Sequence, residues 1–287
     1  MSDKLALKGA ALSFAFLVLI LLAWYGATAP STPPGTAAAS SASAEYDALM
    51  GKGAAADPDA IKGFPTPMQF AEVAARNLAA PFYDNGPNDK GIGIQLAYSL
   101  GRVGLGYLLA MMVAIPLGFA IGMSPLLYRA LDPFIQLLRP ISPLAWMPIA
   151  LYTIKDSTVS SIFVIFICSV WPMLVNTAFG VAGVRKDWLN VALTLEVSPL
   201  RKAFLVILPA AAPAIITGMR ISMGIAWLVI IAAEMLIGGT GIGYFLWNEW
   251  NNLSIANVLF AVATIGVVGM ILDRAFGLIL KKVTYAE

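Results

Sequence analysis

The sequence predicts an all-α, polytopic membrane protein with six transmembrane helices and a helical loop on the cytoplasmic side. Hydrophobic residues make up 59% of the 287 residues and charged residues 12%, against about 45–50% and about 25% in soluble globular proteins. A compact soluble domain needs more polar side chains than this to cover its surface. The apolar runs are long and lack the two-residue alternation of strands, which favours helical spans over a transmembrane barrel.

The first predicted span is an N-terminal transmembrane helix at residues 1–26. An A-x-A triplet that begins at Ala27 fits a signal-peptidase site, so a cleaved signal peptide is the alternative to a retained helix. We favour the retained helix, because Trp24 and Tyr25 are typical anchors at the membrane interface.

Residues 27–90 are expected to form a periplasmic linker. Residues 27–63 are rich in Ala, Ser, Pro and Gly and show no helical or strand period, which is typical of a disordered segment. Near residues 66–80 the apolar side chains recur at helical spacing after Thr66, a residue type that caps helices well. This pattern predicts a short amphipathic helix on the membrane surface.

Residues 91–280 are predicted to be the transmembrane domain, followed by a cytoplasmic tail at 281–287. A helix needs about 20 apolar residues to cross the membrane, and five runs reach that length: 94–123, 131–154, 158–180, 210–236 and 255–280. Lys and Arg gather on one side of these runs if both termini are cytoplasmic, as the positive-inside rule expects. The chain is therefore expected in the inner (plasma) membrane.

The composition argues against several other functions. The net charge of +2 gives no reason to expect nucleic acid as a partner. The chain has no histidine and a single cysteine, Cys168, so no metal site is expected. It also lacks the G-x-x-x-x-G-K-[ST] phosphate-binding loop, so it should bind no cofactor and hydrolyse no ATP by itself. The composition therefore gives no sign of an enzyme.

The cytoplasmic loop at residues 183–209 is the most informative segment. Its sequence predicts two short amphipathic helices separated at Ser198-Pro199, because proline ends one helix and is tolerated in the first turn of the next. The loop is too apolar for a plain connector, and exposed apolar helices usually mark a docking site for a partner.

This loop resembles the signature of ABC-importer permease subunits, which reads E-A-A, three residues, glycine, nine residues and I-x-L-P. Ala192 matches the second alanine of the signature, and residues 206–209 (VILP) match its end. Asn190 replaces the glutamate and Glu196 replaces the glycine. The resemblance implies that the loop docks ATPase subunits. The residues expected at that contact are Asn190, Ala192, Leu193, Glu196, Pro199 and Arg201.

Motifs elsewhere resemble the nitrate/bicarbonate branch of the same family, among them RPISPLAWMPI from Arg139 and AWLVIIAAEM from Ala226. The resemblance implies a type I importer with two permease copies, expected to be a homodimer, and two ATPases that hold ATP and Mg. A periplasmic or lipid-anchored solute-binding protein and membrane lipids complete the expected partners. The implied cargo is a small inorganic anion, foremost nitrate or nitrite. The same machine carrying bicarbonate, cyanate or a sulfonate such as taurine is the alternative.

A broken helix supplies the first candidates for the substrate pathway. Three prolines fall between Arg139 and Pro148, and a broken helix persists at membrane depth only inside protein or beside a cavity. Ser142 and Trp146 are therefore pathway candidates. The alternative is a kinked scaffold helix in which Trp146 only packs.

The span at 210–236 contains two charged residues, Arg220 and Glu234, and its Trp227 is a further pathway candidate. The two charges are about 21 Å apart along a helix, too far to pair with each other. Arg220 could attract an anion on the pathway, or form an ion pair, or extend to the interface. Glu234 would repel an anion and is expected to accept hydrogen bonds from another segment.

Two other classes of protein fit the sequence less well. An ion-coupled secondary transporter usually shows an inverted internal repeat and intramembrane acids for the ion, and the sequence shows no convincing repeat. A membrane-embedded enzyme is disfavoured, because there is no histidine and Cys168 lacks a visible base.

Overall fold

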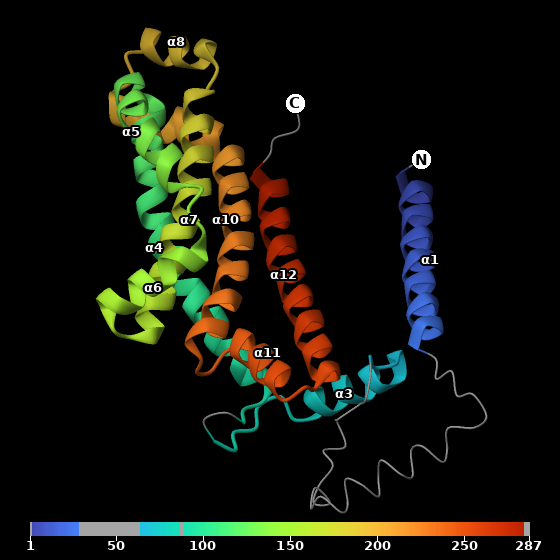
Figure 1. Cartoon of the computed structure of the whole chain (residues 1–287). Helices are drawn as coiled ribbons and strands as arrows, with labels where there is room; N and C mark the ends of the chain where they lie inside the picture. Colours follow the sequence, from blue (N-terminus) through green and yellow to red (C-terminus); the bar gives the residue numbers. More distant parts are fainter. Residues whose placement is uncertain (1, 29–63, 87–88, 284–287) are drawn as a thin grey trace, which may run out of the picture. The chain divides into compact units, whose positions relative to one another are not determined.

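The computed structural model describes residues 2–28, 64–86 and 89–283 (Figure 1). Within these residues the regular secondary structure is helical, apart from one isolated β-bridge between Asp84 and Lys90. The linker segment at 29–63 and the last residues of the predicted tail lie outside the described part.

Five of the described helices are long and apolar enough to cross a membrane, and a bent pair of shorter helices makes a sixth span when counted as one. The prediction of an all-helical, polytopic fold is therefore confirmed. The five long segments are Leu7–Thr28, Ile92–Met123, Ser157–Ala182, Pro199–Ile237 and Ile255–Val283.

The chain divides into two units, and the first comprises Met1–Pro81 and Leu246–Ala263. Its described helices are α1 (Ser2–Thr28), α3 (Pro67–Ala79), the later part of α11 (Ile242–Asn251) and the first part of α12 (Ile255–Val283). The start of α3 is a capping box, in which the Thr66 hydroxyl accepts from the Gln69 N–H at 3.3 Å and Gln69 Oε1 accepts from the Thr66 N–H at 2.8 Å. Trp24 Nε1 of α1 donates to the Pro65 carbonyl at 2.9 Å, which joins α1 to the start of α3.

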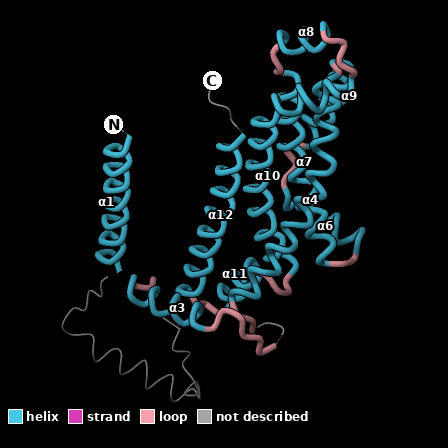
Figure 2. Tube along the Cα trace, turned by 180° about the vertical axis from the view of Figure 1, so that it is seen from behind, coloured by secondary structure: helices cyan, strands magenta, loops and turns pink. Residues whose placement is uncertain are grey.

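The second unit comprises Phe82–Phe245 and Thr264–Glu287. Its central helices are α4 (Ile92–Met123), α7 (Ser157–Ala182) and α10 (Leu208–Ile237), which run side by side in both views (Figures 1 and 2). Glycine permits the close approach of α4 to α7, because a Cβ at Gly118 would lie 2.7 Å from the Leu174 carbonyl oxygen. The later part of α12 packs on the same unit through Phe276, whose ring lies edge-on to Tyr107 at 5.9 Å.

A sharp bend separates α5 (Pro125–Leu138) from α6 (Pro143–Ile154), and their axes differ by 91°. The sequence predicted one run at 131–154, whereas the structure begins this segment earlier and breaks it at residues 139–142. Pro140 and Pro143 flank the break and lack the N–H that a continuous helix needs. The Ser142 hydroxyl restarts the helix by accepting from the Leu144 N–H at 3.3 Å.

The loop after α7 contains one separate helix, α8 (Lys186–Thr194), and a second helical stretch that is continuous with α10. That stretch runs through α9 (Pro199–Lys202) and a π-helical turn, η1 (Ala203–Ile207). The expected second loop helix is thus the first part of a segment that extends over the 39 residues Pro199–Ile237.

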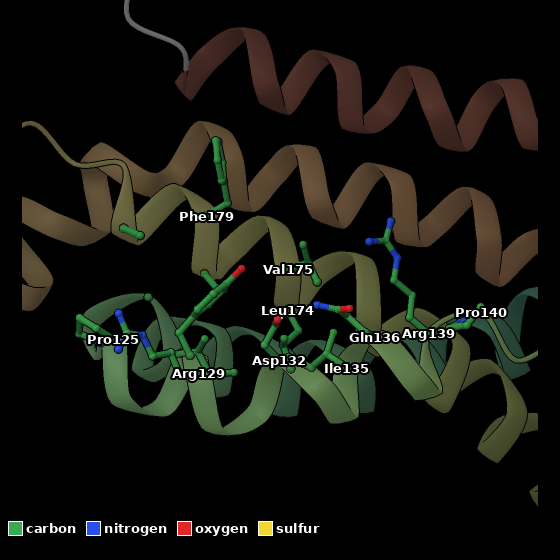
Figure 3. A pocket seen from close by; sticks show the side chains of 15 residues that line it. Pro125, Arg129, Asp132, Ile135, Gln136, Arg139, Pro140, Leu174, Val175 and Phe179 are labelled. Atoms are coloured by element: carbon green, nitrogen blue, oxygen red, sulfur yellow. Dashed lines mark hydrogen bonds between the residues drawn. The ribbon is translucent and has the colours of Figure 1, made fainter.

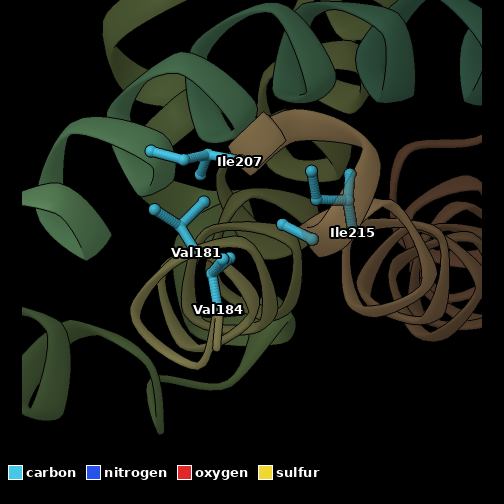
Figure 4. Close-up of a cluster of buried hydrophobic side chains, with 5 residues drawn as sticks. Val181, Val184, Ile207 and Ile215 are labelled. Atoms are coloured by element: carbon cyan, nitrogen blue, oxygen red, sulfur yellow. The ribbon is translucent and has the colours of Figure 1, made fainter. Parts of the chain in front are cut away.

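A hydrophobic cluster ties the loop to the central helices at the end of the unit where α8 lies (Figure 4). Its buried members are Val181, Val184, Ile207, Ala211 and Ile215. Because these residues come from α7, from the start of the loop and from η1 and α10, the start and the end of the loop are fixed on the transmembrane helices.

Candidate functional site: a loop helix and two cavities

The helix α8 has one face on the protein and one face exposed. Leu189 packs against the hydrophobic cluster, and Ala192 is only 4% exposed. Trp188, Val191 and Leu193 are exposed, Leu193 to 60%. An amphipathic helix that is held on one side and apolar on the other has the form of a docking surface.

The family signature has glycine at the position of Glu196, and the geometry at the end of α8 explains why. The Val197 N–H donates to the Ala192 carbonyl and the Glu196 N–H donates to the Leu193 carbonyl, both at 3.0 Å, which is the Schellman pattern. Glu196 therefore takes a left-handed conformation, with φ of 51°. This conformation costs an L-residue about 1–2 kcal/mol and costs glycine almost nothing.

The structure separates the candidate docking residues into two groups. Ala192 is buried against its own chain, so it seats α8 and has no surface to offer a partner. The exposed members are Asn190, Leu193, Glu196, Pro199 and Arg201.

A cavity of about 910 Å³ lies between α5, the end of α4 and α7 (Figure 3). Its charged lining residues are Arg129, Asp132 and Arg139. Asp132 accepts a hydrogen bond from Gln136 at 2.6 Å. Within the described part of the chain, no acidic side chain pairs with Arg129 or Arg139. The lining therefore carries two positive charges against one negative charge, and the cavity favours anions.

A second cavity of about 330 Å³ lies at the break between α5 and α6, against α7 and α10. Arg139, Pro140 and Val175 line both cavities. Ser142, predicted as a pathway residue, lines the smaller cavity, whereas Trp146 lines neither. We call the two the larger and the smaller cavity.

Arg220 forms an ion pair with Asp273 of α12. Its Nε and Nη2 atoms donate to the two carboxylate oxygens of Asp273, both at 2.6 Å, which is the bidentate geometry. The sequence left three alternatives for Arg220, and the structure shows the ion pair. Trp227 donates through Nε1 to the Ile265 carbonyl at 3.0 Å, so both residues connect α10 to α12.

Glu234 is 1% exposed and forms the centre of a polar network. Its carboxylate accepts from Arg102 Nη1 at 2.8 Å, from the Ser99 hydroxyl at 2.8 and 2.9 Å, and from the Gly243 N–H at 3.0 Å. The expectation that Glu234 accepts from another segment agrees with these contacts, since two of its donors lie on α4. Gln95, also on α4, accepts from the Gly241 N–H at 2.6 Å, so the glycine-rich loop after α10 is fastened to α4.

Sequence reasoning left several of these partners out. Asp273 was detectable as an acid inside an apolar run, which often pairs with a buried base. In the sequence, Arg129 is one of the basic residues that the positive-inside rule places on the cytoplasmic side, and Arg139 marks the start of the broken segment. No local signal shows that either arginine lines a cavity, because the cavity forms between separate helices.

Helical spans, a loop helix with an exposed apolar face and a cavity with excess positive charge together define the membrane subunit of a transporter. The comparisons with known proteins identify its family. Residues 106–285 match the family model described as "Binding-protein-dependent transport system inner membrane component". The chain belongs to this family, so it is an ABC-importer permease subunit and not an enzyme.

Similar proteins include anion permeases of the same family. The nitrate import permease protein NrtB of Synechocystis sp. is 46% identical over 223 residues, which cover 78% of this chain and 81% of that protein. The bicarbonate transport system permease protein CmpB of Synechocystis sp. is 47% identical over 207 residues, covering 72% of this chain and 74% of that protein. A structure of the MetNI methionine ABC transporter in an inward-facing conformation is similar in fold, with a TM-score of 0.59 over 66% of this chain and 94% of that chain, at 13% identity.

Proposed function

We propose that this chain is the permease through which an ATP-driven importer moves nitrate, and with it nitrite, across the inner membrane by alternating access. The observation that carries the proposal is the 46% identity to a nitrate permease over 78% of the chain. The excess positive charge of the larger cavity supports it independently, because an anion needs such a lining to cross a medium of low dielectric constant.

Bicarbonate is the second candidate cargo, since a bicarbonate permease is 47% identical over 72% of the chain. Nitrate and bicarbonate are both small, planar oxyanions with one negative charge. A guanidinium group suits both, because its planar arrangement of donors matches planar oxyanions. Cyanate and sulfonates such as taurine are tested alongside them.

Family membership implies ATPase and solute-binding partners. We propose that the end carrying α8 is cytoplasmic, because Arg185, Lys186, Arg201 and Lys202 lie there. Both chain termini are then cytoplasmic. Two copies of the permease and two ATPases form the complex, the ATPases hold ATP and Mg and contact the exposed face of α8, and the binding protein delivers the anion from the other side.

The test is the ATPase activity of the complete complex, reconstituted in liposomes with its binding protein. Nitrate, nitrite, bicarbonate, cyanate and taurine are titrated separately, and uptake of the same solutes is measured in parallel. We expect nitrate to stimulate the ATPase activity, and to be taken up, at lower concentrations than the other solutes. If bicarbonate stimulates the ATPase and is taken up at lower concentrations than nitrate, bicarbonate is the cargo and the proposed ABC importer is otherwise unchanged. Uptake that follows an ion gradient and needs no ATPase would overturn the proposal.

A further inference from the structure

The two cavities follow each other along α7. The larger cavity is lined by α7 residues between Leu174 and Ala182, and the smaller one by α7 residues between Cys168 and Asn176. The 15 residues from Cys168 to Ala182 extend about 21 Å along a helix, so together the cavities reach from the end of α7 near α8 to the middle of the span. Val175 lies at the midpoint of this length.

Arg139 lies where the two cavities meet, since it lines both of them together with Pro140 and Val175. It is the C-cap residue of α5 and the first residue of the break between α5 and α6. In Figure 3 its side chain extends away from the α5 ribbon. An anion that moves from the smaller to the larger cavity therefore passes this guanidinium group.

The charge of Arg139 is uncompensated, unlike that of two other arginines in the spans. Arg102 is paired with Glu234 and Arg220 with Asp273, whereas no acidic partner of Arg139 is found in the described part of the chain. Arg139 lies in the bent pair of helices that counts as one candidate span, and an ionisable residue without a partner in such a segment is a functional candidate. A bound anion would supply the missing charge.

The surroundings of Arg139 suit a small anion with part of its hydration shell. The smaller cavity of about 330 Å³ has room for several waters at about 30 Å³ each. Ser142 and Asn176 line it. The Ser142 oxygen accepts from the Leu144 N–H and Asn176 donates to the Pro172 carbonyl, which leaves the hydroxyl hydrogen and the second amide hydrogen for another acceptor.

We propose that Arg139 binds the transported oxyanion at the junction of the two cavities, and that Arg129 adds positive charge along the larger cavity. The ligand class is a small planar oxyanion with one negative charge. This inference rests on the proposed function and extends it by assigning a binding site within the membrane. Binding there is transient, because a transporter must release its cargo again.

The experiment compares Arg139→Gln and Arg139→Lys in the reconstituted complex with binding protein and ATPases. Arg274→Gln is the matched control, since Arg274 is exposed on α12 and lines neither cavity. Nitrate uptake is expected to fall at least tenfold in Arg139→Gln and to recover in part in Arg139→Lys, whereas Arg274→Gln keeps the uptake of the unaltered complex. Uptake by Arg139→Gln within twofold of the unaltered complex would overturn the inference.

A direct binding measurement covers the case in which Arg139→Gln fails to assemble. The unaltered complex is treated with phenylglyoxal, which modifies arginine, and the modified peptides are quantified by mass spectrometry. Nitrate is expected to slow modification of Arg139 at least threefold and to leave Arg274 unchanged, whereas taurine has a smaller effect. Equal modification with and without nitrate would overturn the inference.

Two further measurements distinguish nitrate from a lipid headgroup as the ligand of Arg139, and failure of this inference from failure of the proposed function. In liposomes of phosphatidylcholine alone, protection by nitrate is expected to persist. If instead protection of Arg139 comes from added phosphatidylglycerol and not from nitrate, the site holds a lipid headgroup and the inference is wrong. If the unaltered complex transports neither nitrate nor bicarbonate, the proposed function itself fails, which is seen before any variant is compared.

Discussion

Arg102 on α4 donates to Glu234 on α10 at 2.8 Å, and the same guanidinium donates to the Thr240 carbonyl at 2.7 Å. One side chain thus joins two spans and the loop that follows the second. Because Glu234 is 1% exposed, the pair is shielded from water, and its charge is balanced inside the protein. The network therefore holds the glycine-rich loop after α10 in one position on α4.

Removal of Glu234 is expected to destabilise the permease strongly. Glu234→Ala leaves Arg102 without its carboxylate, and breaking a buried pair by removing one partner costs about 3–5 kcal/mol. Ser99→Ala removes a single hydroxyl from the same network and is expected to cost about 1–2 kcal/mol. Thermal unfolding of the purified permease in detergent measures both. Equal unfolding temperatures for Glu234→Ala and the unaltered chain would show that the network contributes nothing.

Two glycines of α4 are expected to respond to alanine in opposite ways. A Cβ at Gly118 would meet the Leu174 carbonyl at 2.7 Å, whereas a Cβ at Gly104 has no atom within 4 Å. Gly118→Ala must push α4 away from α7, which costs about 1–3 kcal/mol. Gly104→Ala gains the better helix propensity of alanine, up to about 1 kcal/mol. The unfolding temperature checks both, and an unchanged or higher unfolding temperature for Gly118→Ala would contradict the close α4–α7 contact.

Glu196→Gly is expected to stabilise the end of α8. The residue has φ of 51°, and glycine adopts this conformation without the cost of about 1–2 kcal/mol that a Cβ brings. Glu196→Ala keeps the Cβ and serves as the control for loss of the carboxylate. Slower hydrogen exchange of the Val197 amide, which donates to Ala192, is the measurement. The same exchange rate in the glycine and alanine variants would mean that no strain is present.

Leu193→Asp and Ala192→Arg are both expected to abolish co-purification of the ATPase, for different reasons. Leu193 is 60% exposed, so its variant should insert and unfold as the unaltered chain does and lose only the docking contact. Ala192 is buried, so arginine there should also lower the unfolding temperature by displacing α8. Thr158→Asp, an exposed position at the start of α7, is the control. Normal ATPase co-purification with Leu193→Asp would rule out the docking role of α8.

The sequence alone was sufficient for the class of fold and for the loop helix. Apolar runs of about 20 residues become spans because the hydrocarbon core admits little else, and Pro140 and Pro143 remove two backbone donors within four residues, which favours a break there. The amphipathic pattern around Ala192 and the match at residues 206–209 are local as well. These features depend on near neighbours in the chain, so they can be read from it directly.

Tertiary structure alone decided which charges are paired and which are free. Arg102 meets Glu234 across 132 residues and Arg220 meets Asp273 across 53 residues, while Arg139 is left at the junction of two cavities. Such pairings depend on how the helices are rotated and shifted against one another. That packing is set by close contacts such as Gly118 against Leu174, between segments far apart in the chain, and no local pattern contains it.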